Sequence, residues 1–91
     1  MSTSKEKQIE VLEEHYRHCL AFWKREKHSE ITAQAMALND ILRTRHNPFV
    51  PRGEVLDAEV RKTVVENTLQ EFCETVRNEL ETTLTNRALQ Q

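Results

Sequence analysis

Residues 9 to 23 carry more apolar surface than one packing contact can cover. At about 100° per residue, a helix here has a first apolar stripe made of Ile9, Leu12, Tyr16, Cys19, Leu20 and Trp23. A second stripe, offset by roughly 100°, contains Val11, His15, His18 and Phe22. A surface helix usually presents one apolar arc of about 100°. We therefore expect this helix to be covered on two sides, and we expect another molecule to cover the second side.

Composition supports a small helical protein that needs extra stabilisation. The chain has 91 residues, of which 37% are hydrophobic and 31% charged, and a single Gly and two Pro leave little turn chemistry for a sheet. A domain of this size buries only about 60–65% of its unfolded surface, and oligomerisation is a common remedy. The first residues contain no apolar run, and two cysteines without an export signal suggest reduced thiols. We therefore expect a cytoplasmic protein that does not enter a membrane.

Capping signals divide the first half of the chain into two helices. Thr3 and Glu6 match a capping box, which predicts a first helix over about residues 4–27. Ser29 followed by an acidic residue resembles a second N-cap, which predicts a helix over about 30–44. Because no Gly or Pro enforces the break, an unbroken helix to Arg45 is the alternative.

The second half begins with a loop over 45–56 and continues as one long helix. Two prolines hold the loop extended or turned, and Gly53 permits a positive φ. Asp57 is the expected N-cap of a helix over about 57–86, after which the chain should fray. Apolar positions recur in this helix every four residues, a spacing that winds about 40° per step. Its first turns should therefore face one neighbour and its last turns another.

These elements predict an all-α fold, a small three-helix bundle that forms a single helical domain over residues 1–91. A long two-helix hairpin is the alternative. The two apolar stripes of the first helix predict that homodimerisation completes the bundle, most simply as a two-fold dimer through that helix.

The residues that could carry chemistry are few. His15, His18 and Cys19 share helical spacing and could bind zinc together with Cys73 or His46. The chain has no C-x₂-C pair and no H-E-x-x-H, and both cysteines lie on apolar stripes, where thiols are usually inert. We therefore interpret the cysteines as packing residues and the histidines as interface residues. The sequence predicts no enzyme, no metal and no cofactor.

Two groups of basic residues could contact nucleic acid. One includes Lys24 to His28 and the other Arg43 to Arg52, at opposite ends of the 30–44 helix and roughly 20 Å apart. The 57–86 helix is acidic and phosphate would repel it, which argues against nucleic-acid binding as the main role. Within the loop, residues 47–49 resemble the NPF peptide that EH domains bind, although Phe49 and Val50 are better interpreted as a plug at the end of the bundle.

The function predicted from these observations is a small cytosolic protein–protein interaction module, an adaptor or regulator that acts by binding. A nucleic-acid-binding transcriptional regulator is the alternative, and a metal-binding helical protein is a weaker one. The expected partners are a second copy of the chain and another protein. The candidate interface contains Val11, His15, His18, Phe22, Phe49 and Val50.

Overall fold

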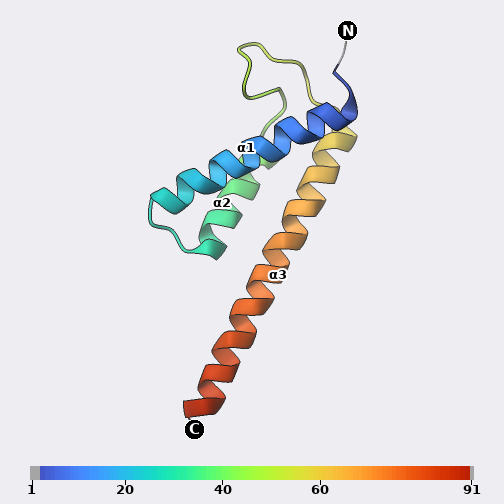
Figure 1. Cartoon of the computed structure of the whole chain (residues 1–91). Helices are drawn as coiled ribbons and strands as arrows, with labels where there is room; N and C mark the ends of the chain where they lie inside the picture. The colour runs from blue at the N-terminus through green and yellow to red at the C-terminus, as the bar shows by residue number, and fades with distance from the viewer. Residues whose placement is uncertain (1–2, 91) are drawn as a thin grey trace.

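The protein is an all-α three-helix bundle, as the sequence predicts. A computed structural model describes residues 3–90, and in this range it contains α1 (Lys5–Arg25), α2 (Glu30–Leu42) and α3 (Ala58–Gln90). α1 and α2 form a hairpin, and α3 packs against it near its own N-terminal end (Figure 1). The alternatives, a two-helix hairpin and an unbroken helix to Arg45, are therefore wrong.

The N-cap of α1 is Ser4 rather than Thr3. The Ser4 hydroxyl accepts a hydrogen bond from the Lys7 backbone N–H at 3.2 Å. The backbone N–H of Thr3 instead donates to the carboxylate of Glu54, at 3.0 Å. The predicted capping box fails because Thr3 is bound to a distant part of the chain, which moves the cap one residue along.

α1 ends at Arg25, two residues earlier than predicted, through a C-terminal motif that normally uses glycine. Lys27 has a φ of 66°, its N–H donates to the Lys24 carbonyl, and the N–H of His28 donates to the Trp23 carbonyl. These two bonds form a Schellman motif. Ser29 then caps α2 by accepting from the Thr32 N–H, which confirms the predicted break.

The loop from residue 43 to 57 is closed by a short antiparallel bridge. His46 pairs with Val55, the N–H of Asn47 donates to the Glu54 carbonyl, and the loop folds back on itself. Contrary to expectation, Arg52 rather than Gly53 has the positive φ, 57°. Glycine is needed at 53 for a different reason: an added Cβ would lie 2.5 Å from the carbonyl oxygen of Asn47.

Gln8 joins the beginnings of α1 and α3 to the end of the loop. It is buried, its side-chain oxygen accepts from the Asp57 N–H at 2.9 Å, and its amide donates to the Thr3 carbonyl. Asp57 caps α3 as predicted, because its carboxylate accepts from the Glu59 N–H at 2.8 Å. The crossing of α1 and α3 is therefore fixed by a polar contact as well as by apolar packing.

The core lies where the three helices meet. It comprises buried apolar side chains from α1, α2, the end of the loop and the first turns of α3: Leu12, Tyr16, Ala37, Ile41, Leu56, Val60 and Val64. All six residues of the first stripe of α1 pack in or against this cluster, as expected. The alanines of α2 allow close approach, since Ala33 and Ala37 are fully buried.

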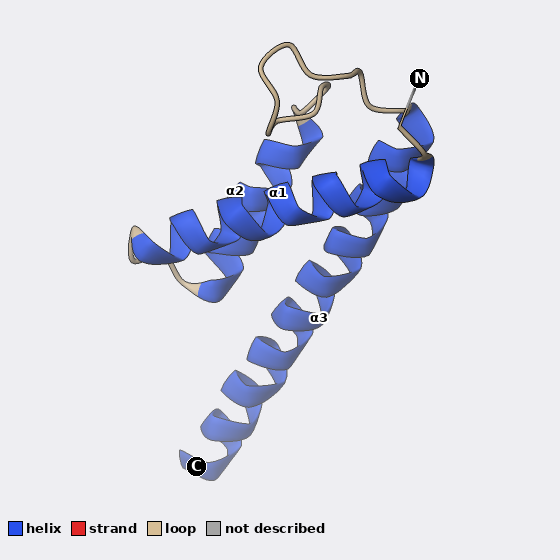
Figure 2. Cartoon of the chain, turned by 45° about the horizontal axis from the view of Figure 1, so that its top comes forward, coloured by secondary structure: helices blue, strands red, loops and turns tan. Residues whose placement is uncertain are grey.

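α3 continues well past the bundle. It reaches Gln90, where the sequence predicted an end near residue 86. The molecule measures 63 × 25 × 16 Å because the C-terminal half of this helix projects from the α1–α2 hairpin (Figure 2). Residues 77–90 are all exposed, so the last turns have no neighbour within the described residues.

Candidate interaction surface

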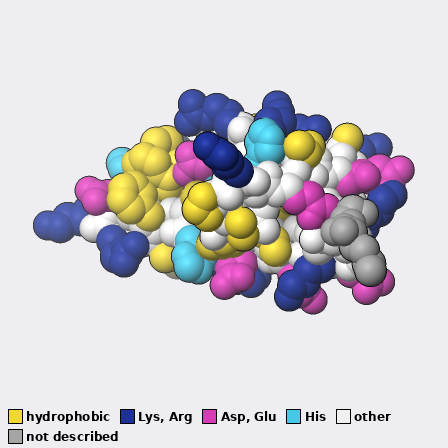
Figure 3. Space-filling model, turned by 90° about the horizontal axis from the view of Figure 1, so that it is seen from above, with side chains coloured by type: hydrophobic (Ala, Val, Ile, Leu, Met, Phe, Trp, Pro, Cys, Tyr) yellow, Lys and Arg dark blue, Asp and Glu magenta, His cyan; other side chains and the backbone are white. Residues whose placement is uncertain are grey.

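The second stripe of α1 and the 43–57 loop together form the surface that contains the predicted interface residues. We call it the aromatic face and define it by Val11, His15, His18, Phe22, Phe49 and Val50. Its largest apolar side chains are half exposed: Phe22 46%, Phe49 45% and Val50 52%. Figure 3 shows hydrophobic side chains gathered on the face seen from above, with histidines and charged side chains of both signs among and around them.

The loop brings Phe49 onto α1. The centre of its ring lies 6.0 Å from that of His15 and 5.5 Å from that of His18, both edge-to-face. This geometry is favourable for aromatic pairs. The prediction that Phe49 plugs the end of the bundle is therefore wrong, because Phe49 packs against the outer side of α1. Its N–H donates to the Asn47 side chain, a local turn that aims the ring there.

The two histidines differ in their surroundings. His15 is half-buried, and this burial lowers the pKa of its imidazole below the ordinary value of 6.5, although nearby Asp40 acts in the opposite direction. His18 is exposed and lies 3.7 Å from the carboxylate of Glu14. At neutral pH the aromatic face therefore presents a neutral His15 beside Phe49, which suits an apolar contact.

Asp40 on α2 interacts with two residues of α1, Trp23 and Cys19. The Trp23 indole N–H donates to an Asp40 carboxylate oxygen at 2.8 Å. Burial, together with Asp40, raises the pKa of the Cys19 thiol to about 11. The thiol therefore stays protonated at neutral pH and is a poor nucleophile. Cys73 differs from the prediction, because it is exposed on α3 rather than packed.

The predicted zinc ligands are only partly brought together. The Cys19 Sγ lies 3.6 Å from the Nε2 of His15, but His46 belongs to the β-bridge of the loop and Cys73 to α3. Across residues 3–90, no group of three or more His, Cys, Asp and Glu side chains is arranged to hold a metal ion.

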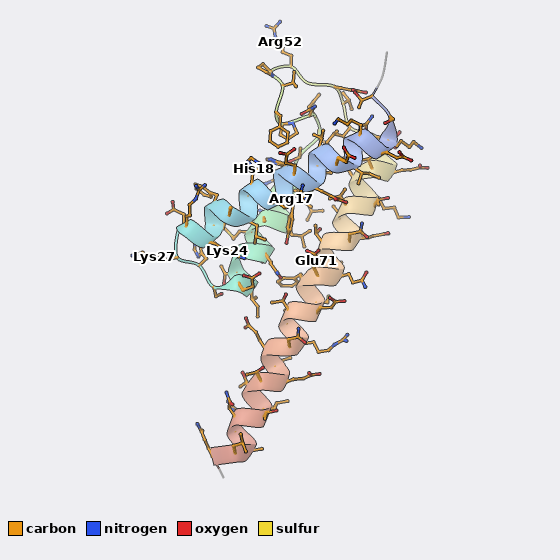
Figure 4. All side chains as sticks on the ribbon, in the orientation of Figure 1. Arg17, His18, Lys24, Lys27, Arg52 and Glu71 are labelled. Atoms are coloured by element: carbon orange, nitrogen blue, oxygen red, sulfur yellow. The ribbon has the colours of Figure 1, made fainter. Side chains whose placement is uncertain are left out.

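The basic residues do not form a single patch. Lys24 and Lys27 lie at one end of the α1–α2 hairpin, whereas Arg52 lies at the tip of the loop, well separated from them (Figure 4). One member of the first group, Lys24, is also paired with Glu30 at 2.8 Å. A duplex would therefore meet two separate clusters, as the sequence suggested.

A groove of about 480 Å³ with polar and apolar lining lies between α1 and α3. Arg17 on α1 and Glu71 on α3 lie on its two sides (Figure 4). Tyr16 is buried at its edge, its hydroxyl has no hydrogen-bond partner within the described part of the chain, and burial raises its pKa to about 12. The phenol is therefore protonated, and the groove offers hydrogen-bonding groups together with apolar surface from Tyr16 and Leu20.

A second apolar surface lies on α3. None of its residues belongs to the candidate interface that the sequence predicts. We call this second surface the α3 strip and define it by Leu69, Phe72, Val76, Leu80 and Leu84. Leu80 is 57% and Leu84 60% exposed. The four-residue spacing of these positions was the available signal, and it indicated that the last turns face a different neighbour from the first.

Within residues 3–90, no helix is long and apolar enough to cross a membrane. The chain matches no protein-family model, no curated protein and no solved structure.

Proposed function

We propose that this chain is a small protein-interaction module, a cytoplasmic adaptor or regulator that acts by binding another protein rather than by catalysis. The observation that carries the proposal is the aromatic face. Phe22, Phe49 and Val50 are half exposed on one side of the molecule, beside two histidines. Aromatic side chains are enriched at protein interfaces, and clustered exposed apolar groups commonly mark such sites.

The arrangement of Phe49 supports this role. The loop holds Phe49 against α1 and still leaves 45% of the side chain exposed, so the ring is available to a partner. Because Phe49 is held between His15 and His18, a partner would not have to order it. Preorganised aromatic anchors of this kind contribute strongly to binding.

The charges around the face favour a mildly acidic partner. A shallow groove beside Phe22 is lined by Arg17, His18 and Arg25 as well as by Glu14. Residues 1–52 contain nine Lys and Arg against seven Asp and Glu. We therefore propose a partner segment that combines apolar anchors with acidic residues, since complementary charges favour association.

The test is affinity capture from the native source with four forms of the full chain. Wild type and Leu89→Glu should retain the same protein, because Leu89 is 80% exposed at the far end of α3. Phe22→Glu and Phe49→Glu should each lose it, since a charge buried at the contact has no partner.

Capture of the same protein by all four forms would show that the aromatic face is not the binding surface. Capture of nucleic acid instead, with a steep loss of binding as salt rises, would favour the nucleic-acid-binding alternative, because phosphate contacts release counterions.

A further inference from the structure

The α3 strip is one face of an amphipathic helix that the bundle does not use. At about 100° per residue, its five residues fall within an arc of about 120°. The residues of α3 that are buried against α1 and α2, Val60, Val64 and Thr68, are centred roughly 140° away on the helix. The strip therefore faces away from the bundle, and a single neighbour cannot cover both faces.

The charges that directly flank the two ends of the strip have opposite signs. Glu66 precedes Leu69, Arg87 follows Leu84, and both fall within or at the edge of the same arc. Val76 lies ten residues after Glu66 and eleven before Arg87, almost at the midpoint. From Glu66 to Arg87 the face therefore runs from negative through apolar to positive, and Lys62, one turn before Glu66, lies in the same arc.

We propose that two copies of the chain pair through this strip, antiparallel, with a two-fold axis close to Val76. Reversal about that point places Leu69 against Leu84 of the second copy and Phe72 near Leu80 of the second copy. It also places Glu66 beside Arg87 of the second copy, twice by symmetry.

The charge order explains why the occupant is a second copy in this orientation. A parallel pair would place Glu66 against Glu66 and Arg87 against Arg87, and like charges in contact are unfavourable. The antiparallel pair satisfies both charges without any other molecule. The contact is short and lies at the small end of specific interfaces, so we expect a dissociation constant of some tens of micromolar, on the order of 10⁻⁵ M.

The surface at the beginning of α3 leaves room for the end of a second helix. A shallow cavity of about 300 Å³ lies between α2 and α3, and its lining combines the apolar Ile41, Leu42 and Val65 with the basic Arg45, Arg61 and Lys62. Leu42 is 47% exposed there. The C-terminal turns of the second copy would cover its apolar part, which extends the contact beyond Leu69.

This contact differs from the dimer through the first helix that the sequence suggested. The second stripe of α1 is already covered in part, because Phe49 packs on His15 and His18. On the α3 strip Phe72 and Val76 are half-buried, but Leu80 (57%) and Leu84 (60%) are more exposed than Phe22 (46%) or Phe49 (45%). Self-association is therefore assigned to α3, and the aromatic face stays free for a different protein.

The first experiment is sedimentation equilibrium of the full chain from about 2 to 200 µM. Wild type and Leu89→Glu should form dimers, because Leu89 lies opposite the strip on the helix. Leu80→Glu should sediment as a monomer, with a dissociation constant raised at least about 100-fold. Both leucines lie outside the core, so circular dichroism should show the same helical content in all three proteins.

The second experiment tests the orientation by charge reversal. Glu66→Arg and Arg87→Glu should each weaken the dimer about tenfold, and the double variant should return to the wild-type dissociation constant. Three results would overturn the proposal: a wild type that is monomeric at 200 µM, a double variant as weak as the single ones, and a dimer that Phe22→Glu dissociates but Leu80→Glu does not.

Discussion

The first and last turns of α3 have similar apolar spacing and opposite environments. Val60 and Val64 are at most 1% exposed in the core, whereas Leu80 and Leu84 are more than half exposed on the same helix. The helix runs without interruption from Ala58 to Gln90, so the difference is not a change of secondary structure. It is a change in what lies beside the helix.

The cause is the spacing itself. Apolar residues four apart advance about 40° per step, so their stripe turns around the helix as the helix extends. α1 and α2 cover the stripe only as far as Thr68, where it begins to face away from them. The winding of the apolar stripe on a long helix therefore indicates how many separate neighbours the helix can contact, and the last turns of α3 have none within residues 3–90.

The largest expected difference between the two regions is in stability. Leu12→Ala should lower the free energy of unfolding by about 2–5 kcal/mol, because Leu12 is fully buried and a cavity would remain. Leu84→Ala removes the same atoms from an exposed position and should change it by less than about 0.5 kcal/mol. Urea denaturation at about 2 µM, where the proposed dimer is dissociated, measures both. Equal losses would mean that the end of α3 is packed after all.

A smaller effect is expected from the polar contact between α1 and α2. Asp40→Ala leaves the Trp23 indole N–H without its acceptor and should cost about 1.5–3 kcal/mol, typical of a hydrogen bond to a charged group. Trp23 is the only tryptophan, so its fluorescence reports the change directly. Glu79→Ala, on the projecting part of α3, is the matched control and should unfold as wild type does. An unchanged free energy of unfolding in Asp40→Ala would show that the indole N–H finds another acceptor.

The smallest expected effect is a pH dependence of the free energy of unfolding that comes from His15 on α1. Burial lowers the pKa of His15 below 6.5 in the folded chain, so the unfolded chain binds more protons as the pH falls through that value. Stability should therefore decrease from neutral pH downwards and stop decreasing below the folded pKa of His15. His15→Gln should remove the part of the stability loss that His15 causes. The urea midpoints at pH 7.5 and 5 should then differ less than they do in wild type. Identical pH profiles for the two proteins would contradict it.

Local signals in the sequence were sufficient for the architecture. Ser29 and Asp57 act as the predicted N-caps, because capping depends only on a side chain and the N–H groups of the following turn. The cap of α1 was missed by one residue, since Thr3 is held by Glu54, 51 residues away in the sequence. The end of α1 was also imprecise, because Lys27 adopts a conformation that glycine usually supplies.

The surfaces were harder to predict than the helices. The stripe of His15 and His18 could be identified by its period, but its contact with Phe49 depends on how a loop with no periodicity folds back. The spacing in α3 indicated a second neighbour, yet only the structure shows that α1 and α2 end their contact near Thr68. Periodicity predicts which face is apolar, and tertiary packing decides which turns of it stay exposed.

The central claim is that α3 has a packed part and a part that only a second molecule covers. Amide hydrogen exchange of the full chain at 2 and 200 µM tests it most directly, because protection reports local opening along the helix. We predict strong protection of residues 60–68 at both concentrations. Residues 69–84 should be weakly protected at 2 µM and clearly more protected at 200 µM. Uniform protection along α3, unchanged between the two concentrations, would contradict the account.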